Sequence, residues 1–159
     1  MTSRFRSKDH KLDELRALPL FVGLPSQSLR SIANAIEVLA VADETVLVET
    51  GAPARELFVV LDGFISIERD GELEDFLEPT RWSNPLPVLA RQRSDHTLVA
   101  DGGSRLLVLG TRELVTALDT VPGLARRMLV RLAEHNEIVP TFPPADASAW
   151  SMEPRDISH

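Results

Sequence analysis

The most informative segment of the chain runs from Glu49 to Gly63 and reads ETGAPARELFVVLDG. Its residues 51–54 combine Gly, Ala and Pro and predict a turn. The apolar run at residues 57–61 is far too short for a membrane span and predicts a buried β-strand. The Asp62-Gly63 pair that follows predicts a tight hairpin turn, because both residue types tolerate positive φ. The segment therefore predicts a strand between two turns of an antiparallel sheet.

Similar short segments recur across residues 37–110, where the pattern contains no convincing helix. Turn residues separate them at positions 42–44, at Asp70-Gly71 and at positions 101–103. Several short strands at close intervals predict an antiparallel β-roll or jelly roll. The expected strands cover residues 38–41, 45–49, 56–61, 64–68, 76–77, 96–100 and 105–109.

Two helices are predicted before this region. Leu12, Leu15 and Leu18 recur at intervals of three, and Pro19 ends their helix because the residue before proline leaves the helical region. A second helix starts near Pro25 and Ser26, and its apolar face consists of Leu29, Ile32, Ala33 and Ile36.

Two more helices are predicted after the strands. Thr111 is the expected N-cap of the first, with Glu113 in its first turn and Leu114, Val115 and Leu118 facing inward. Pro122 is expected to start the second, which runs to about Glu137 and has the apolar stripe Leu124, Met128, Leu129 and Leu132. The fold class is therefore α+β, an antiparallel β-roll flanked by N-terminal and C-terminal helices.

Composition divides the chain into three parts. Residues 1–8 are expected to be a flexible N-terminus and residues 9–138 a single domain. Residues 139–159 are polar and broken by Pro140, Pro143, Pro144 and Pro154, so we expect an extended or disordered tail. Phe142, Trp150 and Met152 in this tail are candidates for anchoring a protein partner, because large apolar groups there have no core of their own.

Charge and composition exclude several classes of function. The 159 residues include 24 acidic and 17 basic side chains, a formal net charge of −7, which disfavours a general nucleic-acid-binding surface. The chain has no cysteine, which excludes disulfides, thiolate nucleophiles and Cys-ligated metals. No apolar stretch of secretory-signal or membrane-span length is present, so we predict a cytoplasmic protein with no transmembrane segment.

The order of these elements resembles the cyclic-nucleotide-binding domain family across about residues 12–137. The segment from Glu49 to Gly63 is similar to the family pattern G-x-x-x-x-x-L-Y-V-V-L-x-G. The segment LPLFVGLP at residues 18–25 is similar to the family's entry before its second helix. TLVA at 97–100 and LLVL at 106–109 resemble its last two strands. The chain looks like a stand-alone, degenerate member of this family.

The resemblance implies a phosphate-binding cassette at about residues 82–97. In the family, a Gly-Glu pair opens the cassette and the Glu accepts the ribose hydroxyl. Backbone amides of a small helix and an Arg bind the phosphate, since an anion needs convergent N–H donors and a cation. A ligand in this chain would therefore meet Ser83, Asn84, Leu86, Arg93, Ser94 and Thr97.

This chain departs from that pattern at most of these positions. Ser83 and Asn84 stand where Gly and Glu are expected, and Pro85 and Pro87 delete backbone donors and discourage the small helix. The position of the phosphate Arg falls on Ser94. Arg93 is one residue out of register, so its side chain is expected on the other face, where it and Arg91 are interpreted as solvated loop charges. We therefore expect no cyclic nucleotide in the usual mode, and no other cofactor.

No catalytic or metal site is predicted. The histidines His10, His96, His135 and His159 are scattered without metal-ligand spacing. Asp95 and His96 are expected to face opposite sides of a strand, so they cannot form a catalytic triad with Ser83 or Ser94. Six carboxylates crowd residues 68–78; we interpret them mainly as a solvated face, with Glu72 and Glu74 as candidates for docking a basic partner.

The leading hypothesis is a non-catalytic regulatory or accessory protein that binds a protein partner through its surface. The alternative is a small-molecule sensor, possibly for a cyclic nucleotide, with an altered pocket. An enzyme whose site a single sequence does not reveal is a third hypothesis.

Overall fold

The structure, a computed structural model, describes residues 8–134 of the chain, with side chains described from Lys11 onward. The chain divides into two compact units at Ala125 and Arg126, so the described residues comprise 8–125 of the first unit and 126–134 of the second. The first unit contains all the strands found among the described residues, and its elements are α1 (Lys8–Arg16), α2 (Ser26–Ala35), β1 (Glu37–Val41), β2 (Thr45–Val48), β3 (Glu56–Arg69), β4 (Glu72–Leu77), α3 (Leu86–Leu89), β5 (Thr97–Gly110) and α4 (Thr111–Thr120).

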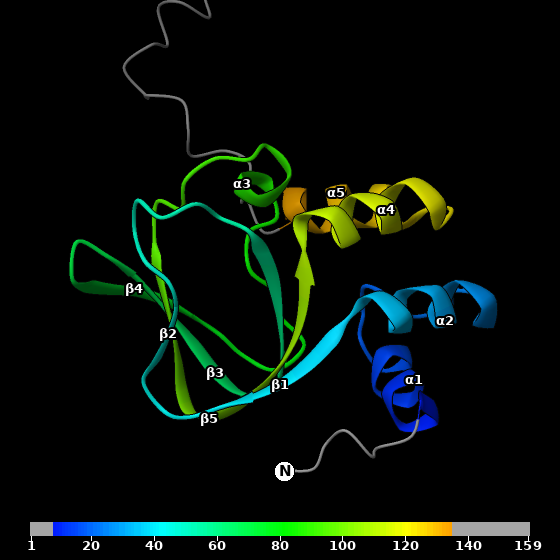
Figure 1. Cartoon of the computed structure of the whole chain (residues 1–159), viewed down its shortest axis with the longest axis horizontal. Coiled ribbons are helices and arrows are strands. Elements are labelled where there is room, and N and C mark those ends of the chain that lie inside the picture. The colour runs from blue at the N-terminus through cyan, green and yellow to red at the C-terminus, as the bar shows by residue number, and fades with distance from the viewer. Residues whose placement is uncertain (1–7, 135–159) are drawn as a thin grey trace, which may run out of the picture. The chain divides into compact units, whose positions relative to one another are not determined.

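The strands form one antiparallel sheet in the order β1-β5-β3-β4, and β2 also pairs with β5. β5 pairs with β3 along most of its length, with β1 near its C-terminal end and with β2 near its N-terminal end. The strands curve into a roll, with α1, α2 and α4 on one side and the β3–β4 hairpin on the other (Figure 1). The predicted α+β fold with a β-roll and flanking helices is therefore confirmed.

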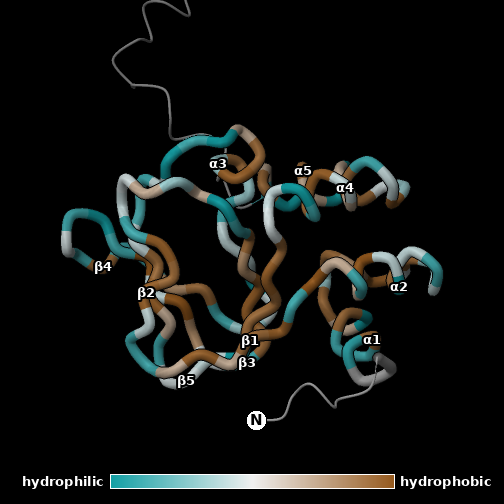
Figure 2. Tube along the Cα trace, in the orientation of Figure 1, coloured by the Kyte–Doolittle hydropathy of each residue, from teal (hydrophilic) through white to brown (hydrophobic). Residues whose placement is uncertain are grey.

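The core of the roll is apolar because alternate residues of its strands point inward. Figure 2 shows hydrophobic residues along these strands and a hydrophilic turn between β3 and β4. The buried core cluster consists of Phe58, Val60, Ile65, Leu77, Leu106 and Val108.

The two N-terminal helices agree with their predicted apolar faces. Leu12, Leu15 and Leu18 are buried, and α1 ends at Arg16, before Pro19. The predicted face of α2 is also buried. The Lys11 Nζ group donates to the carbonyls of Ala33 and Ile36 at 2.9 Å each, so α1 caps the C-terminal end of α2.

One partly buried ion triad connects α1 to the sheet. The Arg105 guanidinium on β5 donates to both carboxylate oxygens of Glu14 on α1, at 2.8 and 3.0 Å, and to Asp62 on β3 at 2.8 Å. Burial lowers the pKa of Arg105, but the hydrogen bonds to Asp62 and Glu14 outweigh it, so the net pKa shift is upward. Arg105 therefore stays charged at every physiological pH.

The predicted hairpin turn at Asp62-Gly63 is wrong, whereas the one at Asp70-Gly71 is confirmed. Residues 56–69 form one strand, because β5 offers partners on both sides of Gly63; Asp62 is opposite Arg105 and Phe64 is opposite Asp101. Gly63 has φ +86° and packs against Ser104, whose Cα would lie 2.9 Å from a Cβ at this position. It therefore allows a bulge within β3.

The predicted turn at residues 101–103 is also wrong. Phe64 follows Asp62 by two positions on β3, whereas their partners Asp101 and Arg105 are four positions apart on β5. Gly102 and Gly103, which lie between these partners, have φ of +69° and +66° and form an irregularity inside β5. A bulge and a turn require the same glycine conformations, so the sequence pattern does not separate them.

Two predictions for α4 need correction. Thr111 is the first residue of α4, Gly110 is the N-cap, and the Thr111 hydroxyl donates to the Arg55 carbonyl at 3.2 Å. Val115 is 38% exposed, because it lies about 100° around the helix from buried Leu114; Ala117 is the second buried residue of α4.

The last helix, α5, covers Leu124–Glu134, so it starts two residues after Pro122. Leu124, Met128 and Leu132 are buried at spacings of four, whereas Leu129 is 57% exposed, which corrects its predicted place in the apolar stripe. The predicted extension to Glu137 lies outside the described residues. The division into residues 1–8, 9–138 and 139–159 stays a prediction.

Candidate functional site

The candidate site is the cassette between β4 and β5, residues 78–96. It contains a short helix, α3 (Leu86–Leu89), in a region where no helix was expected. Pro85 and Pro87 do not prevent this helix, because they lie at its start, where backbone N–H groups have no intrahelical partner. Asn84 Oδ1 accepts a hydrogen bond from the Leu86 N–H at 3.0 Å. The asparagine and the prolines therefore stabilise the helix start.

Ser83 connects the cassette to the core strand β3. Its side chain is buried, and its Oγ accepts a hydrogen bond from the Phe58 N–H at 2.9 Å. The Ser83 N–H donates to the Phe58 carbonyl at 2.8 Å. This position, where the resemblance implies a ligand-contacting Gly, therefore holds a structural serine.

The segment after α3 pairs through its backbone with the turn before β3. Gly51 N–H donates to the Ser94 carbonyl at 2.7 Å, and Ser94 N–H donates to the Ala52 carbonyl at 2.8 Å. The exposed Arg93 side chain donates from Nη1 to the Gly51 carbonyl at 2.7 Å. Arg93 therefore helps to close this turn.

The remaining predicted pocket residues bind one another. Ser94 Oγ donates to the His96 carbonyl at 2.7 Å, and Thr97 Oγ1 lies 2.9 Å from the Thr50 hydroxyl and accepts from the Thr50 N–H at 3.0 Å. Because the Ser94 hydroxyl is directed to a backbone carbonyl, it does not pair with the His96 ring. The structure thus places all six predicted pocket residues in or beside the cassette, and the polar groups of five of them hydrogen-bond within the protein; the sixth, Leu86, does so through its backbone.

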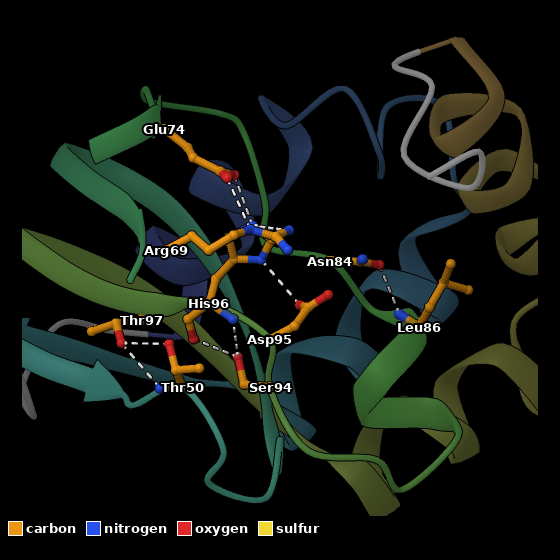
Figure 3. A network of polar contacts seen from close by, with 9 residues as sticks. All are labelled: Thr50, Arg69, Glu74, Asn84, Leu86, Ser94, Asp95, His96 and Thr97. Atoms are coloured by element: carbon orange, nitrogen blue, oxygen red, sulfur yellow. Dashed lines mark hydrogen bonds and ion pairs between the residues drawn. The ribbon is translucent and has the colours of Figure 1, made fainter. Parts of the chain in front are cut away.

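An ionic network that the sequence did not predict lies at the edge of the cassette (Figure 3). The His96 ring contacts Glu74 at 2.9 Å, Asp95 at 3.0 Å and an Arg69 nitrogen at 2.9 Å, and Arg69 also pairs with Glu74 at 2.9 Å. The prediction that Asp95 and His96 face opposite ways is wrong, because these two residues form a bend before β5 begins at Thr97. Strand alternation does not apply to such a bend, and the chain brings Arg69 and Glu74 there from the β3–β4 hairpin.

The predicted partner-binding residues fall into two groups. Phe142, Trp150 and Met152 lie outside the described residues. Glu72 and Glu74 lie on β4 and are both exposed, but Glu74 belongs to the network around His96. Within residues 8–134, no three His, Asp or Glu side chains are arranged to hold a metal ion, and no helix has the length and apolar character of a membrane span.

The fold is similar to that of solved proteins named as regulatory domains, activators or regulators. The regulatory domain of Toxoplasma gondii PKA with cAMP matches with a TM-score of 0.59 and 21% identity over 69% of this chain and 44% of that chain. The Thermus thermophilus catabolite activator protein matches with a TM-score of 0.67 and 18% identity over 75% of this chain and 58% of that chain. This chain therefore spans about half the length of these two proteins.

The N-terminal domain of a transcriptional regulator from Streptomyces coelicolor A3(2) matches with a TM-score of 0.64 and 25% identity, over 83% of this chain and 99% of that domain. No family profile and no curated protein sequence matches this chain. Both the order of its elements and these structural matches show that the chain has the fold of a cyclic-nucleotide-binding-like domain.

Proposed function

We propose that this chain is a non-catalytic regulatory module that acts by binding another protein, and that its cassette does not hold a cyclic nucleotide. Its structural neighbours include proteins named as a regulatory domain, a catabolite activator protein and the N-terminal domain of a transcriptional regulator, which supports a regulatory role. Among the described residues no group has the geometry of a catalytic site: the Ser94 hydroxyl is bonded to a backbone carbonyl, and the His96 ring is bonded to carboxylates and Arg69.

The observation that carries the proposal is the state of the backbone donors at the start of α3. Pro85 and Pro87 have no N–H, and the Leu86 N–H already donates to Asn84. A bound phosphate needs several convergent donors together with a cation. The candidate cation Arg93 donates to the Gly51 carbonyl, and Asp95 adds a negative charge two residues further on.

The expected loss of affinity for a cyclic nucleotide is large. A hydrogen bond to a charged group contributes about 1.5–3 kcal/mol. Losing two or three of them weakens binding by roughly two to several powers of ten. A cyclic nucleotide that binds an intact cassette with a Kd of about 1 μM would therefore bind this chain with a Kd of at least about 100 μM.

Titration calorimetry of the full chain with cyclic AMP and cyclic GMP tests this proposal. We expect no binding heat at micromolar ligand from either nucleotide. A matched variant, Arg93→Gln, should give the same result as the unchanged chain, because Arg93 serves the turn at Gly51. Micromolar binding that Arg93→Gln abolishes would overturn the proposal and support the altered-pocket sensor instead.

A further inference from the structure

The outer face of the sheet around β3 and β4 carries large apolar side chains. Ile65, Ile67 and Leu77 contribute to the core or pack against it. Because side chains alternate along a strand, Phe64 and Phe76 lie on the opposite, outer face. Their rings touch edge to face, with centroids 6.3 Å apart and an angle of 66° between their planes. Phe64 is nevertheless 46% exposed and Phe76 44% exposed.

The strand register extends this apolar surface across four strands. Phe76 on β4 is opposite Ser66 on β3, Ser66 is opposite Val99 on β5, and Val99 is opposite Val46 on β2. Val46 is 49% exposed. Leu73 of β4 is 53% exposed and shares this face, because a register shift after Ile67 pairs it with Glu68, two residues from Ser66. We call Val46, Phe64, Leu73 and Phe76 the outer patch. In Figure 1 the β3–β4 hairpin and β2 lie on the side of the roll away from α1, α2 and α4.

Carboxylates border the outer patch. Glu68 is paired with Leu73, Glu44 directly precedes β2, and Glu78 directly follows β4. Within residues 11–134, none of these three carboxylates forms an ion pair. Residues 68–78 hold six carboxylates and a single cation, Arg69, which is engaged with Glu74 and His96. The surface therefore combines an apolar centre with an uncompensated negative border.

We propose that the outer patch is the surface on which a protein partner docks, through a segment that combines apolar side chains with Lys or Arg. This inference rests on the proposed function, since it assigns the binding surface of the proposed regulatory module. Burying the four apolar side chains supplies affinity in proportion to the area removed from water. The carboxylates supply orientation and faster association with a basic segment.

Charge complementarity favours this occupant over the C-terminal residues 135–159 and over a second copy of the chain. Residues 135–159 of the chain itself contain four acidic side chains (Glu137, Asp146, Glu153 and Asp156) and one basic side chain, Arg155. A second copy of the chain carries a net charge of −7. The C-terminal residues would place carboxylates against carboxylates, and the net negative charge of a second copy opposes its approach. Nucleic acids and anionic lipid surfaces are excluded as occupants by the same repulsion.

The test uses two fluorescein-labelled peptides of equal length, one of alternating leucine and lysine and one of alternating leucine and glutamate. Fluorescence anisotropy with the full chain measures the affinity of each. We expect the lysine peptide to bind and the glutamate peptide not to bind. Leu73→Ser with Phe76→Ser should weaken binding about tenfold or more, because hot-spot apolar contacts dominate such interfaces.

Matched variants separate the patch from the overall charge of the protein. Glu44→Lys with Glu68→Lys should also weaken binding and reduce its dependence on salt. Val115→Ser and Asp119→Lys, both on α4, change the same kinds of exposed side chain elsewhere and should leave affinity within about twofold. Thermal unfolding of every variant checks that it is folded, and Val46→Ser is the substitute if the double variant of Leu73 and Phe76 unfolds.

Equal loss of affinity in the patch and the α4 variants would overturn the inference, since binding would then not depend on this surface. Failure of the lysine peptide to bind, or a preference for the glutamate peptide, would also overturn it. The calorimetric experiment with nucleotides is independent of these outcomes. The proposed function can therefore fail while the patch result holds, and the patch can fail while the cassette still excludes nucleotides.

Discussion

The cassette and the outer patch differ in what their side chains bind. In the cassette, the side chains of Ser83 and Arg93 hydrogen-bond to the backbone of other segments, and those of Asn84 and Ser94 to the backbone two residues further along. On the outer patch, Phe64, Leu73 and Phe76 are about half exposed and are bordered by carboxylates without ion pairs to other described residues. The polar groups of the cassette thus contribute to folding, whereas the patch exposes groups that folding does not use. Substitutions in the cassette should lower the free energy of unfolding, whereas substitutions in the outer patch should lower only the affinity for a partner.

The largest effect on stability is expected for Ser83→Ala. The change removes the acceptor of the buried Phe58 N–H and should lower the free energy of unfolding by about 1–3 kcal/mol. Urea denaturation followed by circular dichroism measures it. Ser28→Ala is the control, because this serine lies on α2, outside the cassette, and is not one of the buried residues of that helix. An unchanged unfolding midpoint for Ser83→Ala would contradict the structural role assigned to the cassette.

A smaller effect is expected for Glu74→Gln, which removes the carboxylate that joins Arg69 and His96. All three side chains are partly exposed, so the loss should be about 0.2–1 kcal/mol and should decrease as salt is added. Glu72→Gln on the same strand is the matched control, since Glu72 forms no ion pair with the described residues. Urea denaturation at low and high salt compares the two. Equal effects from both variants would indicate that the network adds no stability at the edge of the cassette.

The smallest effect is expected for Leu73→Thr on the outer patch. Its side chain is 53% exposed, and threonine keeps the preference for a strand, so stability should change by less than about 0.5 kcal/mol. The same urea experiment measures the change. A loss as large as that of Ser83→Ala would mean that Leu73 is needed for folding, and the contrast between the two regions would then disappear.

Most of the fold follows from local patterns. The spacing of Leu12 and Leu15 identified the buried face of α1, and that of Leu29, Ile32 and Ala33 identified the buried face of α2, because residues three and four apart share one side of a helix. Leu18 and Ile36 are also buried, directly after these helices. The Asp70-Gly71 turn also followed from its residues, which have φ of +54° and +80°. These features depend on neighbours within a few positions of the chain.

Features that depend on distant partners were predicted less well. The same Asp-Gly dipeptide occurs at Asp62-Gly63 and at Asp70-Gly71. At Asp62-Gly63, β5 continues alongside β3, so β3 does not end there. The small helix α3 was not expected, because the sequence does not show that Pro85 and Pro87 lie at positions where an N–H is not needed. The candidate pocket residues were identified from their order in the chain, but not their hydrogen-bond partners.

The sequence alone determined the buried faces of α1 and α2 and the strand-rich centre, because each is a property of residue identity and short-range spacing. Tertiary structure alone decided that β3 and β5 are long bulged strands, that Glu74, Arg69 and His96 meet, and that Phe64, Phe76 and Val46 share one outer face. The physical reason is that strand register joins residues far apart in the chain. The two Asp-Gly dipeptides therefore have different structures, because β5 continues alongside Asp62-Gly63 whereas Asp70-Gly71 forms a turn.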